Sequence, residues 1–240
     1  MDILGVRVDN LEKSEVLEKV SAFLNDPHFH QISTINPEFV LETRRDTNFK
    51  NILNASDLNV ADGVGLAFAF WRKKEKLKSR FAGADLMLSI LEKAAEKNFP
   101  IFLATSSEGL SSWRETRTAI LKLHPHLKIF GADLTGRVTT RFSVSTLDKK
   151  LHEQGNWIVF CNFGAPFQEL FLKNQKNDRI RLAMGVGGSF DYLTGKIRRA
   201  PVFMRKFGLE WLWRFLRQPW RLGRILRAVI VFPVRVILGK

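Results

Sequence analysis

The chain has 240 residues, and 45% of them are hydrophobic, which is enough for one sizeable globular core. A single cysteine, Cys161, excludes an internal disulfide bond and a metal site built from cysteines. No stretch reaches the roughly 20 apolar residues that a membrane-spanning helix needs, and charged residues interrupt the N-terminus where a secretory signal is apolar. These features favour a cytoplasmic protein with one large domain.

The positive charge of the chain is concentrated at its C-terminal end. The whole chain carries +14, and residues 196–240 hold twelve Lys or Arg residues against one acid, Glu210. This segment therefore accounts for +11, and the first 195 residues carry the remaining +3. A block of this kind attracts anions such as lipid headgroups, nucleic acid or phosphorylated substrates.

Apolar, β-branched runs alternate with helical patterns along the first 195 residues. The runs predict strands at Gln31–Ile35, Asp57–Val60, Ile101–Ala104, Leu127–Phe130, Trp157–Phe163 and Ile180–Val186. The helical patterns predict helices at Ser14–Asn25, Pro37–Arg45, Val64–Trp71, Ala84–Lys97, Ser107–Leu123, Arg141–Glu153 and Pro166–Asn174. This alternation is typical of parallel βαβ units, so we expect an α/β fold with a Rossmann-like parallel sheet flanked by helices.

The basic C-terminal segment has a different character, and we treat residues 1–195 as a body and residues 196–240 as a helical, membrane-docking appendage. Pro219 and Pro233 are expected to break the appendage into short helical pieces. Between these prolines, an apolar stripe lies opposite a basic face, as in helices that lie on lipid. The stripe consists of Leu222, Ile225, Leu226, Val229 and Ile230. The basic face consists of Arg221, Arg224 and Arg227. Trp211, Trp213 and Trp220 add rings suited to the headgroup region.

Three polar residues lie at or just after the carboxyl ends of the first two strands of the predicted sheet. Ligands of open α/β sheets bind at the carboxyl ends of strands, so Thr34 and Asn36 are candidates for a site there. Asn36 precedes a proline and is equally well explained as a helix cap. Asp62, which precedes Gly63, is either a plain helix cap or a carboxylate placed for general-base work.

Three further motifs place glycines or polar residues at the start of a predicted helix or after a predicted strand. Arg80 precedes Gly83 and is either a diphosphate ligand or a solvated member of a basic run. Gln168 and Glu169 lie in a first helical turn, where Glu169 also suits the helix dipole. Gly185, Gly187 and Gly188 would allow a nucleotide or sugar to approach the backbone closely, although the third glycine of the dinucleotide fingerprint is absent.

The sequence gives little sign of a metal site. No Asp has another Asp two positions further on, so the Asp-x-Asp clamp of many nucleotide-sugar transferases is missing. The five histidines form no helical pair that would favour metal ligation. We therefore expect no metal and no other cofactor, and we expect arginines and backbone N–H groups to bind any diphosphate.

Six motifs, taken in this order, resemble the WecG/TagA/CpsF family of glycosyltransferases, also called glycosyltransferase family 26. They cover nearly the whole chain and lie at Thr34–Val40, Asp62–Gly65, Arg80–Leu86, Gly164–Glu169, Gly185–Gly195 and Arg199–Arg224. The resemblance implies a metal-independent, inverting transfer of a sugar from a UDP-sugar to a lipid-linked acceptor in cell-surface polysaccharide or teichoic-acid synthesis. The acceptor typical of the family is N-acetylglucosaminyl diphospho-undecaprenol, and the typical donor is UDP-N-acetylmannosamine.

The resemblance also implies roles for individual residues. Asp62 matches the general base that takes the proton of the acceptor hydroxyl, and Thr34 and Asn36 match the crevice beside it. Arg80 and Gln168 match residues that contact donor or substrate. The appendage arginines match groups that bind the lipid diphosphate or stabilise the leaving diphosphate; they are Arg214, Arg221 and Arg224.

The implied partners are a UDP-sugar, a polyprenyl-diphosphate-linked acceptor and an anionic membrane surface, with the protein peripheral on the inner face of the cell membrane. Phe167 replaces the lysine usual in the family, which leaves a UDP-glucose donor as an alternative to UDP-N-acetylmannosamine. Two other classes of protein remain alternatives to a glycosyltransferase: a basic nucleic-acid-binding protein and a Rossmann oxidoreductase. We expect no nucleic-acid partner, because the tail has apolar stripes and no nucleic-acid motif. The sequence leaves homo-oligomerisation open.

Overall fold

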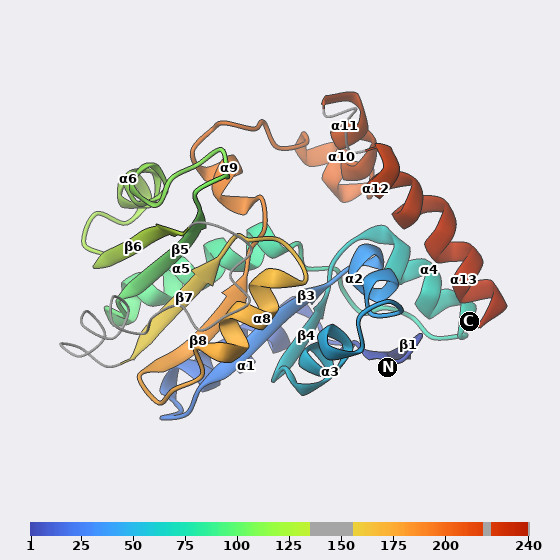
Figure 1. Ribbon diagram of the computed structural model, residues 1–240, viewed down its shortest axis with the longest axis horizontal. Helices are drawn as coiled ribbons and strands as arrows, with labels where there is room; N and C mark the ends of the chain where they lie inside the picture. Colours follow the sequence, from blue (N-terminus) through green and yellow to red (C-terminus); the bar gives the residue numbers. More distant parts are fainter. Residues whose placement is uncertain (135–155, 218–221, 240) are drawn as a thin grey trace.

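The computed structural model describes residues 1–134, 156–217 and 222–239, and its centre is a six-stranded parallel sheet (Figure 1). The strand order is β4-β3-β8-β7-β5-β6, and every neighbouring pair is parallel. The strands are β3 (His30–Ile35), β4 (Leu58–Ala61), β5 (Ile101–Ser106), β6 (Ile129–Leu134), β7 (Trp157–Cys161) and β8 (Ile180–Gly185). All six predicted strands and the predicted α/β class are confirmed.

Helices cover both faces of the sheet. The body helices are α1 (Lys13–Asn25), α2 (Pro37–Glu42), α3 (Thr47–Ala55), α4 (Val64–Arg72), α5 (Gly83–Lys97), α6 (Trp113–Leu123), α8 (Phe167–Asn174) and α9 (Ser189–Leu193). In β5, Ile101 and Leu103 pack into one apolar cluster with α1, α5 and α6, while Phe102 and Ala104 pack into another with α8. The strands are therefore buried on both faces, as the continuous apolar runs predict.

Several boundaries differ from the sequence-based prediction. Helix α6 begins at Trp113 instead of Ser107, because Ser112 forms a capping box with Glu115. Helix α2 ends at Glu42, three residues before the predicted end. The prediction missed α3, which Asp46 caps, and a short hairpin of two strands, β1 (Asp2–Ile3) and β2 (Val6–Arg7). The predicted helix Arg141–Glu153 lies outside the described residues.

The C-terminal segment is helical and packs along one side of the body, beside α2 and α4 (Figure 1). It contains α10 (Val202–Lys206), α11 (Glu210–Arg217), α12 (Leu222–Leu226), a π-helical turn at Arg227–Val231 and α13 (Phe232–Leu238). Phe232 is fully buried in a cluster with side chains of α2 and α4. Within the described ranges, no helix is at once long enough and apolar enough to cross a bilayer.

The expectation that Pro233 ends the helix is wrong, because the helical backbone continues from Leu222 to Leu238. A proline inside a regular α-helix clashes with the carbonyl group four residues earlier, here that of Val229. The π-helical turn precedes the proline and widens the helix where this clash would occur. Pro219 lies outside the described residues.

Candidate functional site

The candidate site lies at the carboxyl edge of the parallel sheet. Thr34 lies in β3, Asp62 directly follows β4, and Gly187 and Gly188 follow β8. Because β4, β3, β8 and β7 are consecutive neighbours, their loops surround one crevice of about 280 Å³. We call this the inner crevice; its lining includes Thr34, Asp62, Asn162, Gln168, Gly187 and Asp191.

A second and larger cavity, of about 560 Å³, lies between the inner crevice and the appendage. We call it the outer cleft. Its walls come from the starts of α2, α4 and α5 on one side and from the appendage on the other. Its cationic lining consists of Lys13, Arg80, Arg199, Arg205 and Lys206, and its apolar lining includes Val64, Val202, Trp211, Ile225 and Val229.

Asp62 lines both cavities. Its backbone N–H donates to the carbonyl oxygen of Ile35 at 2.7 Å, and its Oδ2 accepts from the backbone N–H of Gly83 at 3.3 Å. The next residue, Gly63, has a φ of +87°, a conformation that glycine adopts without strain. The chain therefore turns sharply after β4 and leaves the carboxylate half-buried at the junction of the inner crevice and the outer cleft.

Thr34 and Asn36 lie beside Asp62, as predicted. Thr34 is buried, and a Cβ on Gly83 would lie 3.2 Å from its hydroxyl oxygen, so the start of α5 packs tightly against it. Asn36 caps α2, because its Oδ1 accepts from the backbone N–H of Phe39 at 3.0 Å. Asn36 also lines both cavities, so the capping role and a place at the site coexist.

The amide of Gln168 joins two glycine-containing loops at the floor of the inner crevice. Its Oε1 accepts from the backbone N–H groups of Gly164, at 3.1 Å, and Gly187, at 3.2 Å. Its Nε2 donates to Glu169 Oε1 at 2.7 Å, which fixes the orientation of the amide. A Cβ at Gly185 would lie only 2.6 Å from Gln168 Cδ, so this position needs glycine. Gln168 thus shapes the crevice through the backbone.

Glu169 is a buried titratable group. From the sequence alone, its position in the first turn of a helix is explained by a favourable interaction with the helix dipole. Its side chain is 1% exposed, and among the described residues Oε2 has no hydrogen-bond partner. Burial raises the pKa of Glu169 to about 8, and the hydrogen bond from Gln168 opposes this only in part. The carboxyl group is therefore largely protonated at neutral pH. Nothing in the sequence signals this burial, because it depends on β8 packing against α8.

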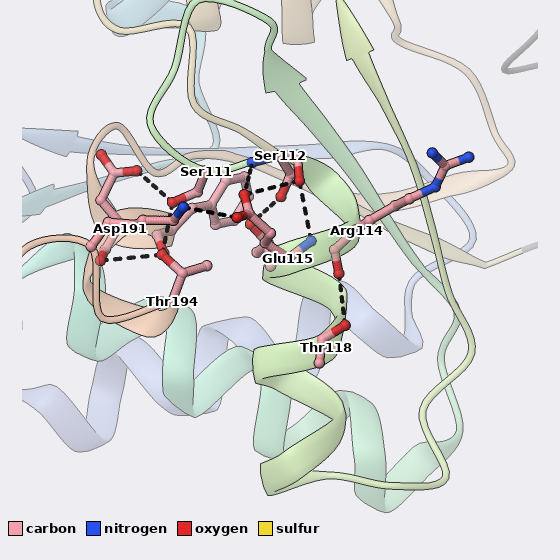
Figure 2. Close-up of polar contacts among 10 residues, drawn as sticks. Ser111, Ser112, Arg114, Glu115, Thr118, Asp191 and Thr194 are labelled. Atoms are coloured by element: carbon pink, nitrogen blue, oxygen red, sulfur yellow. Dashed lines mark hydrogen bonds and ion pairs between the residues drawn. The ribbon is translucent and has the colours of Figure 1, made fainter.

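Hydrogen bonds fix helix α9, which follows β8, against the residues at the start of α6 (Figure 2). The Ser111 hydroxyl donates to Asp191 Oδ1 at 2.7 Å and lies 2.7 Å from the Thr194 hydroxyl. Lys196, the first residue of the basic segment, forms an ion pair with Glu115 Oε1 at 2.8 Å. Asp191, which lines the inner crevice, and the start of the appendage are thus both held by the same helix end.

An ion pair joins the appendage to the start of α5. Arg199 binds Asp85 in bidentate fashion, with N–O distances of 2.6 and 2.8 Å, and Arg205 lies 3.6 Å from the same carboxylate. Burial acts to raise the pKa of Asp85, but the hydrogen bonds and charge of Arg199, aided by Arg205, lower it below its ordinary value. Arg199 lines both cavities, and sequence reasoning did not single it out.

The predicted arginines occupy different places. Arg80 lines the outer cleft, not the inner crevice, and its Nη2 donates to the carbonyl oxygen of Lys206 at 3.4 Å. Arg224 lines the inner crevice, where its Nε and Nη2 bind Glu38 Oε2 of α2 at 2.8 and 2.5 Å. Arg221 lies outside the described residues, and of Arg214 the structure describes only the backbone, in α11.

Two of the appendage tryptophans are described. Trp211 lines the outer cleft, and Trp213 donates through Nε1 to the carbonyl oxygen of Arg198 at 3.0 Å. Trp220 lies outside the described residues.

Among the residues that the structure describes, no three His, Cys, Asp or Glu side chains gather as metal ligands would.

The parallel α/β sheet carries two adjoining cavities at its carboxyl edge. Two carboxylates, Asp62 at the end of β4 and Glu210 in the appendage, line both cavities, and cationic residues partly cover each. This arrangement suits a group-transfer enzyme with two substrates. Comparison with known proteins specifies the family. The family model described as glycosyl transferase WecG/TagA/CpsF family matches residues 1–240, so the chain belongs to this family and is a glycosyltransferase.

Two curated relatives from Bacillus species are similar along most of their length. A protein of Bacillus subtilis (strain 168) is 31% identical over 220 residues, which cover 91% of this chain and 80% of the relative. A protein of Bacillus spizizenii (strain ATCC 23059 / NRRL B-14472 / W23) is 30% identical, with coverage of 91% and 83%. Both are named N-acetylglucosaminyldiphosphoundecaprenol N-acetyl-beta-D-mannosaminyltransferase.

The buried Glu169 predicts a specific pH dependence of stability. Its pKa is about 8 in the folded protein and near 4.3 in an unfolded chain, so the folded state holds an extra proton between these values. The free energy of unfolding should therefore fall as pH rises from about 4.5 to 8, by several kcal/mol at most. Glu169→Gln removes this titration, and its melting temperature should fall less between pH 5 and 8 than that of the wild type.

Thermal unfolding followed by circular dichroism at several pH values measures this difference. Glu108→Gln is the matched control, because Glu108 is exposed and should retain the wild-type pH dependence. Equal pH slopes for Glu169→Gln and the wild type would show that the folded protein does not hold an extra proton on Glu169 in this range.

Proposed function

We propose that the enzyme transfers N-acetylmannosamine from its UDP derivative to N-acetylglucosaminyl diphospho-undecaprenol, with inversion and without a metal ion. The names of the two Bacillus relatives support the sugar and the acceptor. The observation that carries the proposal is the position of Asp62, whose carboxylate lines both the inner crevice and the outer cleft. A base that removes a proton during transfer must lie between donor and acceptor.

The inner crevice suits the nucleotide-sugar donor. A Cβ at Gly164 or Gly187 would meet no atom within 4 Å, so both glycines border open space and leave room for a ligand. Arg199 and Arg224 bring guanidinium groups to the same crevice, where Asp85 and Glu38 hold them in position. Their remaining N–H groups and their positive charge would stabilise the charge that develops on the diphosphate as it leaves.

The outer cleft suits the acceptor. Its cations match the acceptor's diphosphate, and its apolar wall of Val202, Trp211, Ile225 and Val229 matches the start of an isoprenoid chain. The adjoining part of the appendage exposes large apolar side chains, among them Phe203 and Phe207, at 61% and 77% exposure. We assign the appendage to the inner face of the cell membrane, where the polyprenyl tail of the acceptor is embedded.

The proposed reaction is a single displacement. The acceptor hydroxyl oxygen attacks the anomeric carbon while Asp62 takes its proton. The bond between that carbon and the β-phosphate oxygen breaks, the electron pair stays on this oxygen, and UDP leaves. Thr34 and Asn36 border the attacking hydroxyl, while Gln168 maintains the shape of the donor floor. One displacement inverts the anomeric configuration, and arginines take the role that a metal has in other transferases.

Asp62→Asn tests the base assignment. We expect kcat to fall about 10²- to 10⁴-fold with little change in KM, because the amide keeps the shape but cannot accept the proton. Enzymatic detection of released UDP measures this. Asp178→Asn is the control, because Asp178 is exposed and lines neither cavity. Wild-type turnover by Asp62→Asn would contradict the proposed role.

A donor screen tests the substrate assignment. Purified enzyme with a short-chain diphospholipid acceptor should release UDP from UDP-N-acetylmannosamine at least ten times faster than from UDP-glucose. We expect an excess of EDTA to leave the rate unchanged, because the diphosphate is held by guanidinium groups. A preference for UDP-glucose would instead support a role in exopolysaccharide synthesis, and loss of activity with EDTA would contradict metal independence.

A further inference from the structure

A third cavity, of about 340 Å³, lies between the end of α2 and the C-terminal helix. Four arginines line it, Arg44 and Arg45 from the turn after α2 and Arg227 and Arg235 from the C-terminal helix. Glu42 is the one acid in this lining, so the groove carries a local charge of about +3. We call it the arginine groove. It shares no lining residue with the inner crevice or the outer cleft.

The four guanidinium groups lack partners within the described protein. None of them forms an ion pair or a side-chain hydrogen bond with another described residue, and all four side chains are exposed. Arg224, on the same helix, is different because Glu38 binds it. Four like charges around one groove repel one another, and an anion bound between them would relieve this repulsion.

The π-helical turn brings Arg227 and Arg235 to the same side of the helix. In a regular α-helix, two residues eight positions apart point about 80° away from each other. A π-helical turn accommodates about one extra residue, which reduces this difference to about 20°. The irregular turn that accommodates Pro233 therefore also aligns the two arginines along the groove.

An exposed apolar stripe runs along the same helix, beside the groove. Its members follow one another at four-residue spacing and are between 43% and 61% exposed; they are Leu222, Leu226, Ile230, Val234 and Leu238. Phe232 points the other way and is buried against the body, and Ile225 is buried where it lines the outer cleft. This corrects the predicted stripe, which placed Ile225 among the lipid-facing residues.

We propose that the arginine groove binds the phosphate of an anionic phospholipid headgroup while the apolar stripe lies among the acyl chains of the same membrane. A guanidinium cluster next to an apolar strip matches the boundary between headgroup and hydrocarbon. Nucleic acid offers phosphate but nothing to cover the stripe. The acceptor diphosphate must lie near Asp62, which is not part of this groove.

The headgroup site would set the orientation of the enzyme on the membrane. The C-terminal helix contacts α2 and α4, whose first turns line the outer cleft. A lipid held in the groove therefore fixes the helix that forms the wall of this cleft. The inference rests on the proposed membrane function, although the groove itself takes no part in sugar transfer.

Vesicle sedimentation tests the proposal with the full-length chain. Wild-type protein should bind vesicles of phosphatidylcholine with 30% phosphatidylglycerol much better than vesicles of phosphatidylcholine alone. The variants Arg44→Gln/Arg45→Gln and Arg227→Gln/Arg235→Gln should each lose about 30-fold in affinity for the anionic vesicles, since each lipid-facing arginine contributes about 1 kcal/mol. Turnover of a water-soluble, short-chain acceptor without vesicles should stay at the wild-type rate.

Two controls separate a headgroup site from diffuse attraction. Arg114→Gln/Arg117→Gln removes the same charge from α6, on the other side of the molecule (Figure 1), and should cost little affinity. Arg227→Lys/Arg235→Lys keeps the charge but loses bidentate phosphate binding, and should still bind several-fold more weakly than the wild type. Equal losses in the α6 variant, or wild-type binding by the lysine variant, would overturn the proposal.

The two proposals fail in distinguishable ways. An enzyme that releases no UDP from any UDP-sugar, yet binds anionic vesicles through the groove, would contradict the sugar-transfer proposal alone. An enzyme whose groove variants bind vesicles like the wild type, yet transfer sugar to a short-chain acceptor, would contradict the headgroup site alone.

Discussion

All six strands of the sheet are parallel, and the position of the candidate site follows from this constraint. Parallel strands need crossover connections, so each strand ends at the same edge and its following loop turns there. The sheet order puts β4, β3, β8 and β7 side by side, although β3 and β8 are far apart in the chain. One edge thereby collects Thr34, Asp62, Gln168 and the glycines after β8.

The appendage converts this edge into two cavities. Phe232 inserts into the cluster formed by α2 and α4, and Arg199 and Arg224 reach back to Asp85 and Glu38. These contacts place a wall with cationic and apolar residues opposite Asp62. The exposed stripe and the arginine groove lie on the outer sides of the same helix, so the element that closes the cleft is also the element best suited to lipid.

Buried polar groups near the site have structural tasks that support its shape. The amide of Gln168 accepts hydrogen bonds from two backbone N–H groups and donates one to Glu169, and Asn36 caps α2. For both residues a structural hydrogen-bonding role and a place at the site coexist, because a crevice lined by loops needs internal hydrogen bonds to keep its shape. Gly185 belongs to the same arrangement, since any side chain there would meet Gln168 and Glu169.

The sequence by itself determined the six strands, the parallel class and the residues at the strand ends, because burial on both faces gives continuous apolar runs and site motifs follow those runs. It missed α3, the passage of the helix through Pro233, the burial of Glu169 and the pairing of Asp85 with Arg199. The burial of Glu169 and the pairing of Asp85 with Arg199 depend on residues distant in the chain, whose contacts no local pattern encodes. The cap of α3 by Asp46 and the π-helical turn before Pro233 are local features that the pattern of apolar residues did not reveal. Only the tertiary structure decided which side of the C-terminal helix meets the body, since apolar residues lie on both sides and packing selected Ile225 and Phe232.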